Sequence, residues 1–261
     1  MAKAWTTHAT ATDTPPAVRR IGIADLREAL ARGLDDFLAT PTQLAFLCVL
    51  YPVVGLVAAR AMSGGDMVPL LFPLVAGLSL VGPVAAVGLY EISRRREAGQ
   101  PASWRNAFDV LRSPAVFSIA AMGVLVMAIF VAWLFAARAI FAATIATAPA
   151  SVTELAHLAF STPEGQRLIL IGNGVGLLFA VAVLMLTVVS VPMLLDRNVG
   201  IGTAIQTSIR ACLANPVTMA IWGLLVAALL LLGSLPAFIG LAVVMPLLGH
   251  ATWHLYRRVV D

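Results

Sequence analysis

Long apolar segments constrain this chain more than any other feature of its sequence. A helix needs about 20 apolar residues to cross the hydrocarbon core of a bilayer, and such segments recur along the chain after residue 40. Only Gly233 and Ser234 separate the last two, which predicts a tight hairpin. The pattern predicts an all-α polytopic membrane protein with about six transmembrane helices, over residues 44–62, 68–92, 115–143, 168–195, 217–232 and 235–255.

The scarcity of charge supports this fold class. Charged residues make up 11% of the chain, whereas soluble proteins contain about 25%. The charged residues of this chain are too few to cover a water-soluble globule. The basic residues lie in short loops beside apolar segments, where they act as topology signals and not as a nucleic-acid site. Of 17 basic residues, all but Arg60, Arg138 and Arg167 fall on one side. Because short basic loops stay in the cytoplasm, we expect a multi-pass protein of the bacterial inner membrane with both termini cytoplasmic.

Three linkers on the basic side share one pattern. Each begins at a candidate N-cap (Asp25, Ser103 or Thr203), carries apolar residues at helical spacing and ends at a proline. Such amphipathic helices lie along the cytoplasmic interface, with the apolar face toward lipid and the arginines toward headgroups. The apolar positions are Leu26, Leu30, Leu34 and Phe37 in the first linker, Trp104, Phe108 and Leu111 in the second, and Ile205, Ile209, Cys212 and Leu213 in the third.

Linkers and spans combine into a repeat. Pro83, Pro192 and Pro246 sit late in the second, fourth and sixth predicted spans, and a polar, arginine-bearing end follows each of them. An interfacial helix, an outward span, a returning span and a polar end thus occur three times, which predicts three degenerate hairpin repeats. Residues 1–20, rich in Thr, Ala and Pro, are predicted to be a disordered cytoplasmic tail before one six-helix transmembrane domain over 21–261.

Four segments carry a family resemblance. They are Gly82–Arg95, Ser161–Gly165, Val189–Arg197 and Met245–Arg258, the last with the specific sequence MPLLGHATWHLYRR. These segments resemble an uncharacterised bacterial family of integral membrane proteins, domain of unknown function 2189. The resemblance covers nearly the whole chain after about residue 20. It implies a six-span membrane fold and no activity.

Aligning the returning spans on their prolines brings ionisable residues to matching positions. Glu91 and His254 each follow their proline by eight residues, and Asp196 and His250 by four. Equal spacing predicts equal depth, so we expect the four side chains to converge in an interfacial polar cluster at the cytoplasmic end. In the alternative interpretation, the carboxylates pair with neighbouring arginines and the imidazoles belong to an aromatic interfacial belt.

Two motifs have both a chemical and a structural interpretation. His250 and His254 share a helix face, a spacing that can hold a metal ion or one edge of a haem, although the further ligands of a zinc site are missing. Gly172 and Gly176 form a Gly-x-x-x-Gly pair, which indicates close helix packing, since no strand precedes it as a dinucleotide loop requires. We expect no catalytic residue, cofactor or metal.

The favoured hypothesis is a non-enzymatic membrane protein. The spans are rich in small residues, and their centres carry almost no charge. We expect a structural, accessory or assembly subunit of a larger membrane complex, or an organiser of lipid at the interface, whose partners are the bilayer and a membrane protein or a second copy. The alternatives are a small-molecule transporter or channel, and a haem- or metal-binding membrane protein that uses His250 and His254.

Overall fold

The computed structural model describes residues 16–41, 65–145, 149, 151–197, 199–236 and 238–260. Within these ranges the regular elements are helices, and one isolated antiparallel bridge joins Val18 to Val260. The first predicted span, 44–62, and most of the predicted tail lie outside the described residues. The described fold is all-α, as the apolar pattern predicts.

Four helical stretches of the described chain are long and apolar enough to cross a membrane. They are Val68–Glu97, Val116–Thr144, Pro163–Asp196 and Pro216–Ser234, which correspond to the second to fifth predicted spans. The sixth predicted span, 235–255, is not among them. Its helix, α12 (Leu241–Val259), starts later and carries two histidines and two arginines in its second half, so it is less apolar than the other four.

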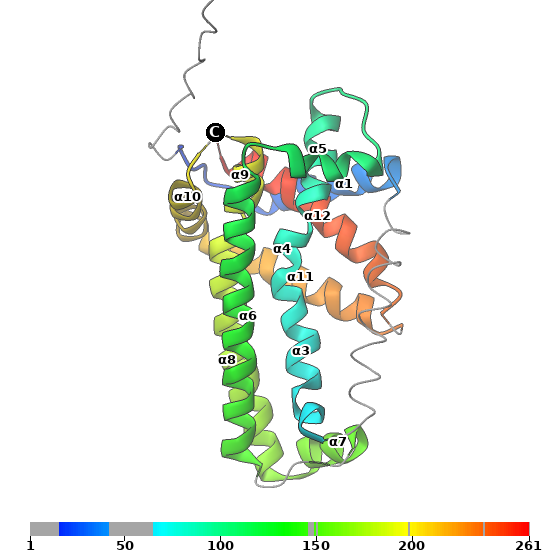
Figure 1. The fold of residues 1–261 in the computed structure, drawn as a ribbon, viewed down its shortest axis with the longest axis vertical. Coiled ribbons are helices and arrows are strands. Elements are labelled where there is room, and N and C mark those ends of the chain that lie inside the picture. The colour runs from blue at the N-terminus through cyan, green and yellow to red at the C-terminus, as the bar shows by residue number, and fades with distance from the viewer. Residues whose placement is uncertain are drawn as a thin grey trace, which may run out of the picture.

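Two long helices form the shaft of the molecule. α6 (Val116–Thr144) and α8 (Pro163–Thr187) lie side by side, and α7 (Val152–Ser161) connects them at the far end (Figure 1). Thr162 caps α8, because its hydroxyl accepts a hydrogen bond from the Gly165 N–H at 3.0 Å. A Cβ at Gly165 would collide with the carbonyl of Leu158. The tight link between α7 and α8 therefore needs glycine at this position.

Prolines interrupt two of the spans. Pro83 has no N–H to donate to the Ser79 carbonyl, and the helix tightens to a 3₁₀ turn at that residue. Pro192 likewise leaves the Val188 carbonyl without its helical donor, and the helix breaks at Val188 and Val189. The elements that result are η1 (Gly65–Leu70), α3 (Leu71–Leu78), η2 (Ser79–Val81), α4 (Gly82–Ala85) and α5 (Val87–Glu97) in one span, and α8 with α9 (Ser190–Asp196) in the other.

The last two helices are joined after Ser234, so Gly233 and Ser234, which the apolar pattern predicts to separate them, belong to the end of the first one. α11 (Pro216–Ser234) and α12 run obliquely to α6 and α8 (Figure 1). Gly233 and Gly240 allow the two helices to approach at the turn, where a Cβ on Gly240 would lie 2.8 Å from the Gly233 Cα. At the other end of α12, the Arg19 N–H donates to the Val259 carbonyl at 2.8 Å. Residues near both termini therefore lie at the same end of the molecule.

The three predicted linker helices are present, and two of them begin at other residues than predicted. They are α1 (Ile23–Ala39), η3 (Trp104–Arg112) and α10 (Ile201–Ala214). Asp25 is not the N-cap of α1, because the helix begins after Gly22, whose N–H donates to the Asp25 carboxylate at 2.9 Å. Thr203 is not the N-cap of α10, which begins after Gly200. Ser103 caps η3 as predicted, but η3 is a 3₁₀ helix and not an α-helix.

The predicted lipid-facing side of α1 is divided between protein and surface. Leu26 and Phe37 are buried, whereas Leu34 is exposed. The reason is the close packing of α1 on α12, where a Cβ on Gly33 would lie 2.6 Å from the Ala251 backbone nitrogen. α1 therefore packs as part of the protein along one face and leaves a second apolar face outside.

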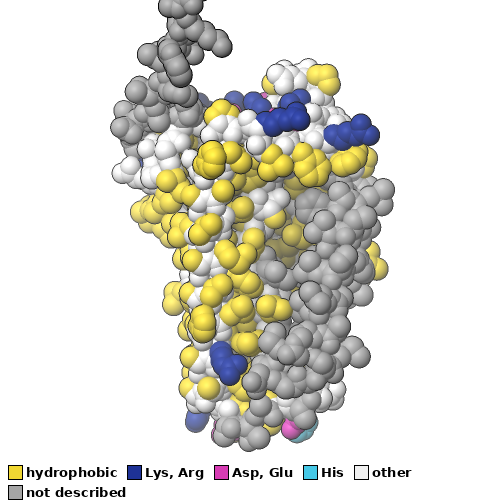
Figure 2. All heavy atoms as spheres, in the orientation of Figure 1, with side chains coloured by type: hydrophobic (Ala, Val, Ile, Leu, Met, Phe, Trp, Pro, Cys, Tyr) yellow, Lys and Arg dark blue, Asp and Glu magenta, His cyan; other side chains and the backbone are white. Residues whose placement is uncertain are grey.

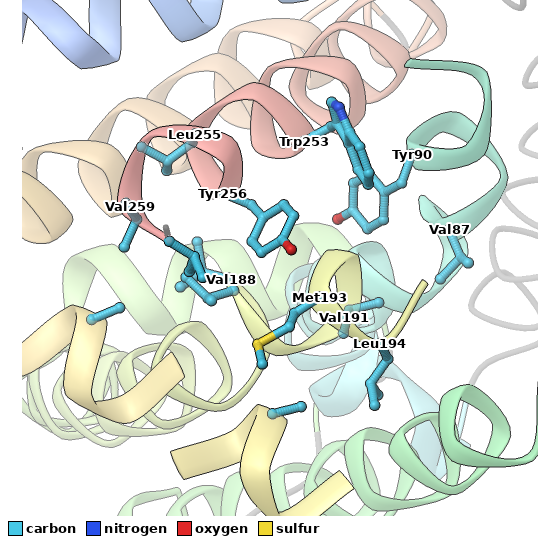
Figure 3. Close-up of a cluster of buried hydrophobic side chains, with 14 of the residues drawn as sticks. Val87, Tyr90, Val188, Val191, Met193, Leu194, Trp253, Leu255, Tyr256 and Val259 are labelled. Atoms are coloured by element: carbon cyan, nitrogen blue, oxygen red, sulfur yellow. The ribbon is translucent and has the colours of Figure 1, made fainter. Parts of the chain in front are cut away.

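The core of the described protein lies at the end of the molecule that holds α1, α5, α9 and α12 (Figure 1). Figure 3 shows side chains of α5, α9 and α12 filling the space between these helices. Trp253 and Tyr256 pack with ring centroids 5.6 Å apart. The labelled core residues are Val87, Tyr90, Val188, Val191, Met193, Leu194, Trp253, Leu255, Tyr256 and Val259, all nearly or fully buried.

The surface divides by charge along the long axis. Basic side chains gather at the end that holds the core, and hydrophobic side chains cover the visible parts of the shaft (Figure 2). Large apolar residues of the spans, such as Phe117, Leu170 and Leu224, are exposed. Apolar surface exposed along a helix of this length is what a lipid environment accommodates. The arginine-rich end is the one that the charge pattern assigns to the cytoplasm.

Candidate functional site at the arginine-rich end

A buried polar network joins α1, α5 and α12. Asp36 on α1 accepts a hydrogen bond from Nε2 of His254 at 2.8 Å, and it forms an ion pair with Nε of Arg96 at 2.6 Å. The Ser93 hydroxyl lies 2.8 Å from Nδ1 of His250 and also forms a hydrogen bond with Asp36. Ser93 and His250 are fully buried, and Asp36 is nearly so. One carboxylate thus connects three helices that are far apart in the sequence.

The proton positions in this network follow from its chemistry. A carboxylate only accepts hydrogen bonds, so the Ser93 hydroxyl donates to Asp36 and accepts from Nδ1–H of His250. Nε2 of His250 is then the unprotonated nitrogen of a neutral ring. This atom and Nδ1 of His254 are buried without a hydrogen-bond partner among the described residues. His250 therefore carries its proton on Nδ1, which faces Ser93, and His254 donates through Nε2 to Asp36.

The pKa values of Asp36 and His250 are both lowered, which keeps Asp36 charged and His250 neutral. Burial alone raises the pKa of Asp36, but hydrogen bonds from His254, Ser93 and Arg96 outweigh it and lower the pKa to about 2. Burial lowers the pKa of His250 to about 4, against the opposing influence of the Asp36 charge. At neutral pH the site therefore holds a carboxylate and a neutral His250.

A second network surrounds the first. Glu91 is buried and accepts from Nε of Arg94 at 2.8 Å and from Nε of Arg95 at 2.9 Å. Arg95 also reaches Asp109 of η3 at 2.8 Å. These ion pairs fix the end of α5 and attach the linker helix η3 to it.

The end of α9 is held to α12 in the same way. The Tyr256 hydroxyl donates to Asp196 at 2.7 Å, and Nη1 of Arg257 lies 3.3 Å from the same carboxylate oxygen. Burial, aided by the charge of Asp196, raises the pKa of Tyr256, so the phenol stays protonated as a donor. Glu97 accepts from Nε1 of Trp253 at 3.0 Å and from Nε of Arg257 at 3.1 Å. The polar ends of α5 and α9 are thus both tied to α12.

The four residues of the predicted cluster lie on helices that pack together at this end, but they belong to two networks. Glu91 and Asp196 pair with arginines and Tyr256, whereas His250 and His254 contact Ser93 and Asp36. The carboxylate that meets an imidazole is Asp36, which the proline alignment does not include. Asp36 lies on the buried face of α1 with Leu26, Ala29, Gly33 and Phe37. A carboxylate on an otherwise apolar helix face was the sequence signal for it, since such a charge needs a partner.

The two histidines of the metal or haem interpretation lie within the polar network. One nitrogen of each imidazole is engaged in a hydrogen bond within the protein, and both rings are buried. Among the described residues, no group of three or more His, Cys, Asp or Glu side chains is arranged to hold a metal ion. The two histidines connect α12 to α5 and α1 through one ring nitrogen each.

The predicted glycine pair behaves unequally. A Cβ on Gly176 would lie 3.1 Å from the ring of Trp133 on α6, so this glycine permits the packing of α6 on α8. Among the described residues, nothing lies within 4 Å of a Cβ placed on Gly172 or on Gly174. Close packing is therefore shown for Gly176, while Gly172 lies on an open face of α8.

The fold and its surface define an all-α integral membrane protein. Residues 71–196, from the start of α3 to the end of α9, match the model of a family described as a predicted integral membrane protein of unknown function, DUF2189. The family resemblance that the motifs indicate is confirmed over this segment. Neither a curated protein nor a solved structure matches the chain.

Proposed function

We propose that this chain is a non-enzymatic assembly or accessory subunit that packs against another membrane protein, or a second copy of itself, through the open face of α8. Asn173 carries this proposal. Its amide is exposed on a helix of a candidate membrane span, and it donates to the Ile169 carbonyl at 2.7 Å. A side-chain amide that lacks hydrogen-bond partners raises the free energy of a helix in lipid. Asn side chains in membrane helices commonly form hydrogen bonds across helix interfaces.

The residues beside Asn173 suit such an interface. Gly172 and Gly174 flank it, and space is open above both. Small residues let a second backbone approach closely, which brings a partner within reach of the amide. Asn173 lies six residues beyond the exposed Arg167, about 9 Å along the helix. It is therefore placed below the charged end of the span, where lipid offers no hydrogen bond.

Purification in a mild detergent tests this function. The wild-type protein is expected to elute with a stoichiometric companion or as an oligomer, measured by light scattering and by mass spectrometry of the bound proteins. Asn173→Leu removes the amide and adds bulk, so it should release the partner. Leu178→Ala, on an exposed position of the same helix, is the control and should retain it. A monomer without companions in the wild type would contradict the proposal.

We also propose the complete architecture that the sequence predicts: six spans in three hairpin repeats, with both termini in the cytoplasm of a bacterial inner membrane. Its support is the gathering of basic side chains at one end, together with the presence of η3 before α6 and of α10 before α11. Reporter fusions at Gly64 and Ala150 should read external, and fusions at Gln100 and Gly200 cytoplasmic. An external signal at Gln100 would overturn the orientation. Transport of a small molecule stays an alternative prediction.

A further inference from the structure

The linker helix η3 is attached to the protein along two of its three sides. A 3₁₀ helix has three residues per turn, so residues three apart are aligned in rows. One row contains Ala107, which lies against Gly88 of α5, and the buried Val110. A second row contains Asn106 and Asp109, which bond to each other at 2.9 Å, and it ends at the exposed Arg112. Asp109 is also the residue that Arg95 of α5 holds at 2.8 Å.

The third row of η3 faces away from the protein. It consists of Arg105, Phe108 and Leu111, and Phe108 and Leu111 are 61% and 69% exposed. Trp104 is half exposed beside this row, with its ring edge-on to Phe108 at 6.3 Å and the Arg105 guanidinium 5.8 Å from its centre. The 3₁₀ geometry therefore changes the predicted apolar face, because it brings a basic residue into line with two large apolar ones.

The position of this row relative to the spans identifies what it meets. Phe117, in the first turn of the span α6, is 84% exposed and follows η3 by five residues. Figure 2 shows basic side chains above a band of hydrophobic side chains at this end of the molecule. The exposed row therefore continues the apolar surface of the spans at the level where hydrocarbon gives way to headgroups.

The two basic residues of η3 lie at its surface. Its one acidic residue, Asp109, is paired with Arg95. Arg105 and Arg112 are both exposed, and neither has an acidic partner among the described residues. Two unpaired guanidinium groups thus lie beside apolar side chains that reach into the acyl region. Guanidinium groups bind phosphate oxygens in a bidentate manner.

We propose that η3 is a binding site for anionic phospholipids in the leaflet at the arginine-rich end, with Arg105 and Arg112 contacting the headgroups and Phe108 and Leu111 inserted among the acyl chains. This site requires only that the protein is inserted in a bilayer, and it is independent of the protein partner proposed for α8. One basic residue near a membrane surface contributes roughly a fivefold preference for anionic lipid. Because the two contributions multiply, two such residues predict a preference of roughly 25-fold.

Native mass spectrometry of the purified full-length protein tests the site. The protein in mild detergent is titrated separately with phosphatidylglycerol and phosphatidylcholine, and bound lipids are counted at each concentration. We expect the wild type to retain phosphatidylglycerol roughly 25-fold better. In R105Q/R112Q this preference should fall to about twofold or less, and R105Q or R112Q alone should give intermediate values.

The matched control removes the same charge from the opposite end. R138Q/R167Q changes two exposed arginines of α6 and α8, and it should keep the full preference. An unchanged preference in R105Q/R112Q would overturn the proposal. An equal loss in R138Q/R167Q would also overturn it, because net charge and not the site would then govern retention.

Discussion

The arginine-rich end and the shaft of this protein are held together in different ways. At the arginine-rich end, α1, α5, α9 and α12 bury polar side chains among one another, and Asp36, Glu91, Ser93 and His250 all have partners on a helix or turn nearby. Along the shaft, 28% of the most apolar part of α6 and 50% of that of the span Pro163–Asp196, which contains α8, are buried within the protein. Apolar contact distinguishes poorly between helix and lipid. The specific arrangement of helices is therefore set mainly at the polar end.

The largest effect expected from this contrast is at Asp36. Asp36→Ala leaves Arg96 and His254 without their carboxylate in a buried site, and breaking such a pair costs about 3–5 kcal/mol. Thermal unfolding in detergent should show a large loss of stability. Glu28→Ala is the control on the same helix: Glu28 pairs with Arg32 at 2.8 Å and with Arg258 of α12, but it is 40% exposed. Exposed ion pairs contribute little, so its loss should cost about 1 kcal/mol. Equal effects would show that burial does not distinguish the two carboxylates.

The second effect is a loss of stability in mild acid. The pKa of His250 is lowered from 6.5 in the unfolded chain to about 4 in the folded protein. The unfolded state therefore takes up the proton first as the pH falls. Stability is full above pH 6.5, declines between pH 6.5 and 4, and the total loss is about 3 kcal/mol.

Thermal midpoints across this pH window measure the effect. His250→Gln should flatten the decline, because it removes the titrating ring. His157→Gln, which changes a histidine of α7 at the far end, should leave the decline as it is. Asp36 contributes little in this window, because its stabilisation is lost mainly below it, as the pH falls from its unfolded pKa of 3.8 to its folded pKa of about 2. A wild-type protein with constant stability between pH 6.5 and 4 would contradict the buried, neutral state of His250.

A smaller effect is expected where α1 crosses α12. Gly33→Ala places a Cβ 2.6 Å from the Ala251 backbone, so the helices must separate, at a cost of about 1–3 kcal/mol. Gly202→Ala in α10 is the control, because nothing lies within 4 Å of its Cβ. That change should be neutral or stabilising by up to about 1 kcal/mol. Unfolding in detergent distinguishes the two, and a stable Gly33→Ala variant would mean that this crossing is loose.

The smallest effect is expected at the exposed row of η3. Arg105→Gln removes a solvent-facing charge and should change stability in a neutral detergent by less than about 1 kcal/mol. Phe108→Asp should cost more, since it places a carboxylate where the surface meets apolar chains. Thermal midpoints of both variants in the same detergent test this order. Equal midpoints would indicate that η3 lies in water and not at the interface.

Local sequence predicts much of the described fold. Apolar length gives the spans 68–97, 116–144, 163–196 and 216–234 to within a few residues of their predicted limits. Prolines mark the ends of the linker helices and the breaks at Ser79 and Val188. These features depend on hydrogen bonds within one helix and on the thickness of a bilayer, so they can be read residue by residue.

The polar site needed the tertiary structure. Proline spacing gives the depth of Glu91, Asp196, His250 and His254 along their helices, but depth does not determine which side chains face each other. That depends on the rotation of each helix about its axis and on its neighbours, which Gly33 and Gly249 help to set by permitting close contact with α12 and α5. The pairing of His254 with Asp36, 218 residues apart, and the 3₁₀ winding that turns Arg105 outward both result from packing between helices. Sequence thus determined four candidate membrane spans and which end is basic, while packing between helices decided which charges meet.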